Sequence, residues 1–224
     1  MESIVGVNAV RVSRLLADGT PDYSNPVGAF LVCGGVSTFE HDFETEEGSS
    51  IFERDAAGNA CANRKRTDDI KYTTFTLTMC RDDPRLTEIL LAGDAALLTD
   101  LGNYPTGRGI RPASGCGTAT TKVGVLIELW SELLDCDAPA EPYPYLRAVL
   151  PRAYLTPAGY TREDGLSLPV YNGYAEVNPN VDNGPFDDFD LSEDLSEFCY
   201  FDFGDDALPT CTAPLDYVAL PAAP

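Results

Sequence analysis

The sequence predicts an α+β chain that is mainly β and has one short helix. Glycine and proline are frequent, with 19 and 17 of the 224 residues, and this favours many short strands joined by turns. Apolar and polar side chains alternate over several stretches, whereas one stretch only has clear helical periodicity. The chain is 44% hydrophobic and contains 10 Phe and 11 Tyr, so it can bury a substantial core.

Alternating or β-branched stretches define the expected strands. They are residues 4–12, 28–33, 36–45, 70–79, 145–155 and 166–177. In the first of them Val10 and Val12 share one face and Arg11 lies on the other. Residues 123–134 fit both a helix and a strand, and the Thr and Val residues at their start favour the strand. Pro151 would have to lie at a sheet edge or a bulge.

The stretch 70–93 predicts a strand that leads into the helix. A period of two separates a polar face from an apolar face: Thr74, Thr76 and Thr78 form the first, and Phe75, Leu77 and Met79 the second. Asp83 is a suitable N-cap acceptor, and Pro84 suits the first helical position. Leu86, Ile89 and Leu90 have the spacing of one helical face. We therefore expect a helix over 84–92, closed by Gly93 and packed through these residues on the apolar strand face.

Periodicity disappears over residues 46–66, which predicts a loop of about 20 residues, far longer than usual connections. Ile51 and Phe52 indicate that part of this loop docks on another surface. The basic triplet Arg64, Lys65 and Arg66 has three interpretations: a contact with an acidic patch on another copy of the chain, a solvated loop, or a phosphate contact. A further loop is expected over 102–117 because it is rich in Gly and Pro, and residues 95–101 are expected to extend or follow the helix.

The C-terminal part is unusually acidic. Residues 182–206 carry ten acidic residues and no basic one, with Phe and Tyr interleaved. We expect an extended arm that docks through its aromatic side chains. Residues 1–205 are then a single domain, and 206–224 a proline-rich C-terminal tail.

The net charge disfavours two classes of partner. Fifteen Lys and Arg against 36 Asp and Glu give a net charge of −21, which disfavours binding to nucleic acid phosphates and to anionic membranes. Solubility is the simplest interpretation of this charge.

The sequence contains no recognisable catalytic motif. His41 is the one histidine, and a solvent-facing strand position is favoured over a His–carboxylate pair. A glycosidase-like carboxylate pair would arise by chance in so acidic a chain. Asn178, Asn180, Asp182 and Gly184 resemble a calcium loop, but the glycine is late and no closing glutamate follows. A structural turn is favoured there, and no enzyme activity, metal or cofactor is predicted.

The seven cysteines show no CxxC pair. Their scatter indicates mostly free thiols in a reducing compartment, with a bridge such as Cys199–Cys211 left open. No apolar leader or membrane-spanning run is recognised, so folding in the cytoplasm is expected.

Three passages together resemble the major tail protein, or tail tube subunit, of long-tailed bacteriophages of actinobacteria. They are the strand–helix unit with Asp83-Pro84-Arg85-Leu86 and Gly93, the sequence YPYLRAVLPR over 143–152, and LPVYNGYAEVN over 168–178 before the turn at Gly184-Pro185. The resemblance implies an antiparallel β-sandwich or barrel with one flanking helix. It further implies rings, expected to be hexameric, that stack into a tube through which DNA is ejected.

The resemblance also suggests roles for particular residues. The loop would reach an adjacent subunit or ring, so Ile51, Phe52, Arg64, Lys65 and Arg66 are candidates for subunit contacts. Thr74, Thr76 and Thr78 are candidates for the lumen face, flanked by acidic residues. The implied partners are other copies of the chain, the tail terminator, tape measure and distal tail proteins, and passing DNA without tight binding. The implied location is the virion tail, assembled in the host cytoplasm.

Two other interpretations remain open at this stage. One is a different phage structural protein, such as a capsid decoration or head–tail joining protein. The other is a calcium-dependent carbohydrate-binding β-sandwich.

Overall fold

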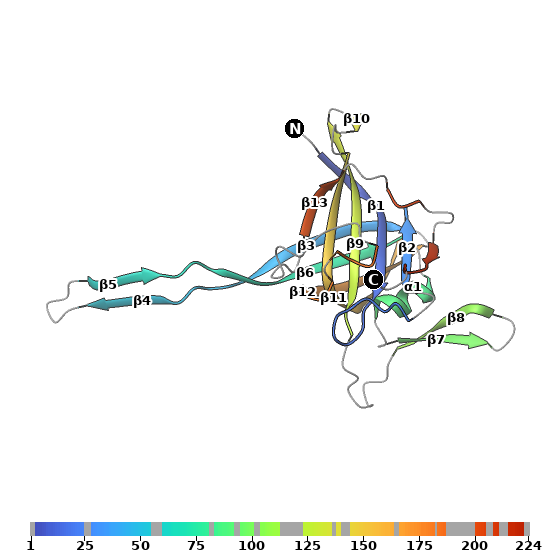
Figure 1. Ribbon diagram of the computed structural model, residues 1–224, viewed down its shortest axis with the longest axis horizontal. Helices are drawn as coiled ribbons and strands as arrows, with labels where there is room; N and C mark the ends of the chain where they lie inside the picture. The colour runs from blue at the N-terminus through green and yellow to red at the C-terminus, as the bar shows by residue number, and fades with distance from the viewer. Residues whose placement is uncertain are drawn as a thin grey trace.

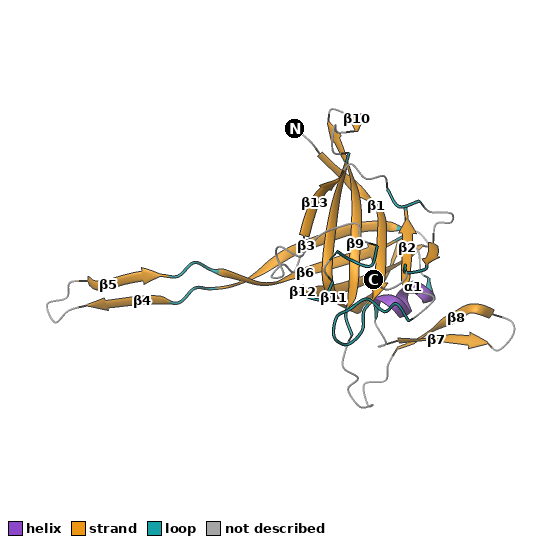
Figure 2. Ribbon diagram, in the orientation of Figure 1, coloured by secondary structure: helices purple, strands orange, loops and turns teal. Residues whose placement is uncertain are grey.

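The computed structural model describes residues 3–24, 28–54, 60–80, 83–91, 95–100, 104–112, 123–135, 138–139, 144–163, 166–181, 183–186, 200–204, 208–210 and 215–221. Within these residues the protein is almost entirely β, and Figure 2 shows one helix beside the strands. The strands are β1 Ser3–Arg14, β2 Ala29–Cys33, β3 Val36–Glu46, β4 Ser50–Arg54, β5 Ala60–Lys65, β6 Asp69–Met79, β7 Ala95–Asp100, β8 Tyr104–Pro112, β9 Val125–Asp135, β10 Ala138–Pro139, β11 Tyr145–Glu163, β12 Leu166–Glu176, β13 Tyr200–Gly204 and β14 Leu215–Val218. The helix is α1 Pro84–Leu90. The predicted fold class is confirmed.

Ten strands form one antiparallel sheet in the order β14-β2-β1-β9-β11-β12-β6-β3, with β10 beside β9 and β13 beside β11. The path ends at β14 and β3, so among the described residues the sheet is open. The sandwich is therefore the correct alternative, and the barrel is wrong. The first half of β11 lies between β9 and β13, and its second half pairs with β12. Pro151 lies at the irregularity between Leu150 and Ala153, as expected of a proline within a strand.

One hydrophobic core unites the two ends of this sheet with the helix. Val10 and Phe30 come from one end, Leu77 and Tyr171 from the other, and Ile89 from α1, and all five belong to one buried cluster. The sheet therefore curls so that its inner face encloses the helix, which Figure 1 shows beside β2 at the lower end of the body. The residues predicted for the helix–sheet contact are all in this cluster: Phe75, Leu77, Met79, Leu86, Ile89 and Leu90.

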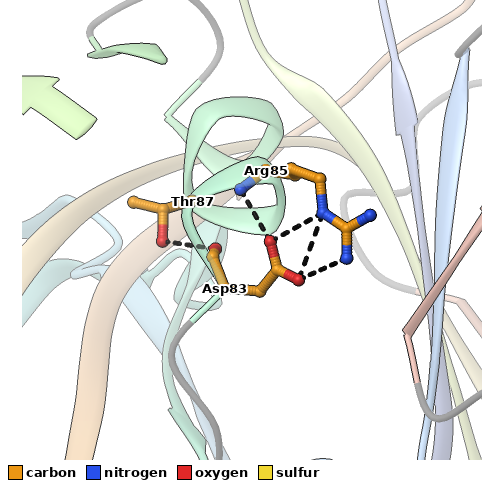
Figure 3. A network of polar contacts seen from close by, with 3 residues as sticks. All are labelled: Asp83, Arg85 and Thr87. Carbon is orange, nitrogen blue, oxygen red and sulfur yellow. Dashed lines mark hydrogen bonds and ion pairs between the residues drawn. The ribbon is translucent and has the colours of Figure 1, made fainter. Parts of the chain in front are cut away.

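The start of α1 matches the prediction. Asp83 accepts a hydrogen bond from the backbone N–H of Arg85 at 2.8 Å, and its carboxylate also contacts the Arg85 guanidinium at 2.6 Å (Figure 3). Thr87 donates to the Asp83 carbonyl at 3.2 Å, and its hydroxyl lies 2.7 Å from that of Tyr171 on β12. The cap thus ties the helix to the sheet. The helix ends at Leu90 with Leu91 as C-cap, earlier than expected, and Gly93 lies outside the described residues.

Several expected loops and tails are strands. Two strands, β4 and β5, lie within the predicted loop 46–66. Residues Ala95–Asp100 form β7, so they follow the helix rather than extend it, and β8 occupies much of the predicted loop 102–117. The predicted tail 206–224 is wrong at Leu215–Val218, because β14 pairs with β2. Of the acidic stretch 182–206, residues 200–204 form β13, which pairs with β11 through the backbone.

A buried ion pair lies on the opposite face of the sheet from α1. The Arg11 guanidinium donates to both Glu128 carboxylate oxygens, at 2.6 and 2.5 Å, and Glu128 is fully buried. The Arg11 guanidinium also stacks on Phe186, at 3.8 Å from the ring centre, and lies 5.1 Å from that of Trp130. The turn that contains Phe186 therefore covers the pair and is held to the sheet by it.

Two further observations concern the expectations from cysteine and hydropathy patterns. Cys33 is disulfide-bonded, so the expectation of free thiols is wrong at this position. Cys80 is a free thiol and is exposed. No helix in the described ranges has the length and hydropathy needed to cross a membrane.

Replacing Asp83 with Ala should lower the free energy of unfolding by about 1–2 kcal/mol at neutral pH, because the N-cap is lost. Burial alone would raise the pKa of Asp83, but its hydrogen bonds with Arg85 outweigh burial and hold the pKa below its ordinary value. The stabilisation is therefore complete above the unfolded-state pKa of about 4 and disappears as the pH falls through the folded-state pKa. Urea titrations at pH 7 and pH 3 test this: a difference between wild type and D83A that persists in full at pH 3 would contradict it. D83N, which keeps a cap acceptor, is the control.

Replacing Glu128 with Ala should cost about 3–5 kcal/mol, because Arg11 is then left buried without its carboxylate. The double variant R11M/E128L should recover most of this loss, since apolar residues of similar volume remove the uncompensated charge. Urea denaturation of the two variants measures both effects. Equal stability of E128A and the wild type would show that Arg11 reaches water without its partner.

Candidate assembly interface

The most prominent feature of the molecule is a two-stranded arm. β3 pairs with β6 from Val36–Met79 to Glu46–Asp69, and β4 and β5 continue the same ribbon. Figure 1 shows this ribbon leaving the body and extending far to the left. Going from the body towards the tip of the ribbon, Thr73 is the outermost buried residue on β6. We therefore define the arm as the described residues from 43 to 72.

The joint between β3–β6 and β4–β5 is tight. A Cβ atom at Gly48 would lie 2.2 Å from the Arg66 carbonyl oxygen and 2.5 Å from that of Thr67. The Gly48 N–H donates to the Asp68 carboxylate at 2.9 Å, and the Arg66 N–H donates to the Ser49 carbonyl at 3.1 Å. Only glycine allows the two chains to approach this closely without a shift, so the ribbon is continuous across the joint.

The structure brings the predicted contact residues together on the arm. Ile51 pairs with Arg64, and Ser50 pairs with Lys65, so Ile51 and Arg64 project from one face and Lys65 from the other. Ile51 and Phe52 are 54% and 53% exposed, although they are large apolar side chains. Arg66, at the joint, is exposed as well.

Sequence reasoning missed three exposed apolar residues at the base of the arm: Phe43, Ile70 and Tyr72. Apolar side chains continue along the two strands past the end of the core: Phe43 pairs with Thr73 on the face of Phe75, and Tyr72 lies on the opposite face with Thr74. That continuation is the signal that could have revealed them.

A second candidate surface, the polar face, is the outer side of β3, β6, β12 and the second half of β11. Thr74, Thr76 and Thr78 are half-buried on it, opposite the core face as predicted. Glu40 pairs with Thr76 and Asp42 with Thr74, so the carboxylates of β3 form a row directly beside the threonines. This is the arrangement expected of acids that flank a hydroxyl row.

Hydrogen bonds connect the polar face across strands. Thr76 and Asn172 side chains are 3.3 Å apart, and Thr74 donates to the Asp42 carbonyl at 3.4 Å. At one end three tyrosines form a row: the Tyr72 and Tyr174 ring centres are 5.9 Å apart, and those of Tyr174 and Tyr154 are 5.1 Å apart. Burial raises the pKa of Tyr154, Glu176 and Tyr174 add to this, and Arg152 opposes it. The Tyr154 hydroxyl is therefore neutral near pH 7.

A third feature is an apolar cavity of about 440 Å³ between β1, β3, β9 and β11, which we call the mouth. Val7, Phe39, Leu129 and Leu146 contribute to its walls, and Glu40 and His41 also line it. His41 is exposed on β3, and its ring lies between those of Phe39 and Phe43, with centres 5.9 and 5.7 Å away. The predicted exposed strand position of His41 is confirmed.

The suspected calcium loop has a structural role. The Asn178 amide donates to the carbonyls of Gly19 at 2.9 Å and Pro151 at 3.1 Å, and its oxygen accepts from the Asn180 N–H at 3.2 Å. The side chain thus joins three segments of the body. Asp182 lies outside the described residues, and within them no group of three His, Cys, Asp or Glu residues is arranged to hold a metal ion.

Comparisons with known proteins identify a distant structural likeness. No family model matches the chain, and no curated protein is similar to it in sequence. A solved structure, the tube terminating cap of the anti-feeding prophage, aligns with 77% of this chain and 87% of its own at a TM-score of 0.34 and 8% identity.

Replacing Gly48 with Val should misdirect the arm without unfolding the body, because the new side chain would meet the backbone at Arg66 and Thr67 while the core is distant. Thermal unfolding should change little. The ribbon amides of residues 46–54 should exchange with solvent faster than in the wild type, as measured by hydrogen exchange. Unchanged exchange in these amides would show that the joint tolerates a side chain.

Proposed function

We propose that this chain is a structural subunit that self-assembles into a phage tail tube, as stacked six-membered rings around a DNA conduit, and that it is not an enzyme. The observation that carries the proposal is the arm. A monomer gains nothing from holding Ile51 and Phe52 in water on a long ribbon, whereas an assembly can bury them against another subunit. The three sequence passages that resemble tail tube subunits support the same conclusion.

The polar face supports a role as the lumen wall. A DNA conduit must not bind its contents, and the carboxylates of Glu40, Asp42 and Glu44 repel phosphates. The neighbouring threonines offer uncharged hydroxyls. Neither Val36–Glu46 on β3 nor Thr73–Met79 on β6 contains a lysine or an arginine. Six such faces, side by side, would form a smooth acidic channel.

The arm supports contact between copies. Its base continues β3 and β6 of the body. The arm carries the basic residues Arg64, Lys65 and Arg66, whereas the whole chain has a net charge of −21. An acidic neighbouring copy attracts this basic segment. Head-to-tail contacts of this kind generate rings or stacks. Other tail proteins would meet the ends of such a stack.

Concentrated purified protein should form tubes or rings visible by negative-stain electron microscopy, and the triple variant R64E/K65E/R66E should not. The variant should still show wild-type thermal unfolding, since the three side chains are exposed. Tubes formed normally by the triple variant would show that the basic segment is a passive part of the arm.

A stable monomer that is absent from purified virions would contradict the proposed function as a whole. A capsid decoration or head–tail joining protein would instead be found in virions without forming tubes, and mass spectrometry of virions separates these cases, because a tube subunit should be among the most abundant proteins. Binding of glycans in the presence of calcium, measured by calorimetry, would favour a carbohydrate-binding protein.

A further inference from the structure

We propose that the mouth of one subunit receives the arm of another, with Ile51 entering the cavity and Arg64 pairing with Glu40 at its edge. This inference rests on the proposed function, because it specifies where the arm binds in the assembly. It assigns a binding site to the mouth and names its occupant as a second copy of this chain.

The cavity has the chemistry to accept an apolar side chain. Its walls include Val7, Phe39, Leu129, Leu146 and Ala148, and Val7 and Phe39 are only partly buried although they pack on the main core. A cavity of about 440 Å³ can hold an isoleucine side chain and part of the strand that carries it. Filling it would complete the burial of these walls.

The edge of the mouth is charged and open. Glu40 lines both the mouth and the adjoining groove on the polar face. β3 ends the sheet path, so in the described part of the chain no strand is hydrogen-bonded to its outer edge, and β1 lies across the mouth from it. Exposed strand edges are usually covered or blocked, and an arriving ribbon would cover this one.

The arm presents the complementary pair on one face. Ile51 and Arg64 are cross-strand partners, so their side chains start about 5 Å apart and point the same way. An apolar group beside a cation matches an apolar cavity with a carboxylate at its edge. Lys65 points to the other face, and its ammonium is 3.7 Å from carboxylate oxygens of both Glu47 and Asp68.

The occupant is another copy, because the arm cannot reach its own mouth. The arm continues directly from β3, which is itself a wall of the mouth, and Figure 1 shows the ribbon extending away from the body. The contact is therefore head-to-tail, and it propagates from subunit to subunit.

Photo-crosslinking tests the site directly. Full-length chain with p-benzoylphenylalanine at position 51 is assembled into tubes, irradiated, and mapped by mass spectrometry. Crosslinks should fall on residues 6–7, 37–41, 129–131 or 146–148 of a second copy. The same probe at Leu16, which is 44% exposed on the body, is the control and should not label these segments. Crosslinks from position 51 to other segments, or no crosslink in assembled tubes, would overturn the inference.

Charge reversal provides an independent test. R64E should raise the critical concentration for tube assembly about tenfold or more, and E40R/R64E should return it to within about threefold of wild type. K71E makes the same charge change at the base of the arm, where the Lys71 ammonium forms an exposed ion pair with Glu46 at 3.2 Å, and should stay within about threefold. Failure of E40R to rescue R64E would overturn the pairing. If the crosslinking or the charge-reversal test fails while the wild-type chain still forms tubes, the proposed function stands and only this inference is overturned. If the wild-type chain forms no tubes, both the inference and the proposed function are overturned.

Discussion

The antiparallel pairing of β3 with β6 is the interaction on which the rest of the structure depends. Its register places Phe75, Leu77 and Met79 in the core against α1, and it sets Thr74 and Thr76 beside Asp42 and Glu40 on the outside. Because side chains alternate with a period of two, a slip of one residue would exchange these faces. The same two strands then leave the body and become the base of the arm. One register therefore fixes the core, the polar face and the direction in which the arm points.

The other end of the sheet is held by a different kind of force. There the outer face carries the buried charges of Arg11 and Glu128. Their mutual attraction offsets the cost of removing them from water only if their geometry is good and each has further partners. The bidentate contact and the stacking of Arg11 on Phe186 supply both. The ion pair confers specificity, since Phe186 has a defined place over the guanidinium. The turn at 183–186 thus covers the ion pair on this face of the sandwich.

The sequence predicted those elements whose local pattern and final environment agree. Thr74 to Met79 alternate because one face is buried, and Asp83-Pro84 begin α1 because a cap works through neighbouring residues alone. The arm was wrongly expected to be a loop, because both faces of a free two-stranded ribbon are in water and Ile51 and Phe52 are adjacent rather than alternating. Strand β14 was missed because pairing with β2, far away in sequence, decides its structure. The tyrosine row and the mouth were missed because they depend on the order of strands in the sheet, which a local sequence pattern does not encode.

Two quantities matter for the arm: the stability of the free ribbon and the strength of its proposed contact with another subunit. An isolated two-stranded hairpin is marginally stable in water, and here the paired base in the body holds the two chains together from one end. Ile51 and Phe52 are about half exposed, so burying the remainder of each contributes roughly 1 kcal/mol. One such contact is weak, but in the proposed ring every subunit would make it, and each contact formed would raise the effective concentration for the next. Under the proposed function, a weak arm contact would leave the chain monomeric at low concentration, while closure of the ring would make the assembled state persist.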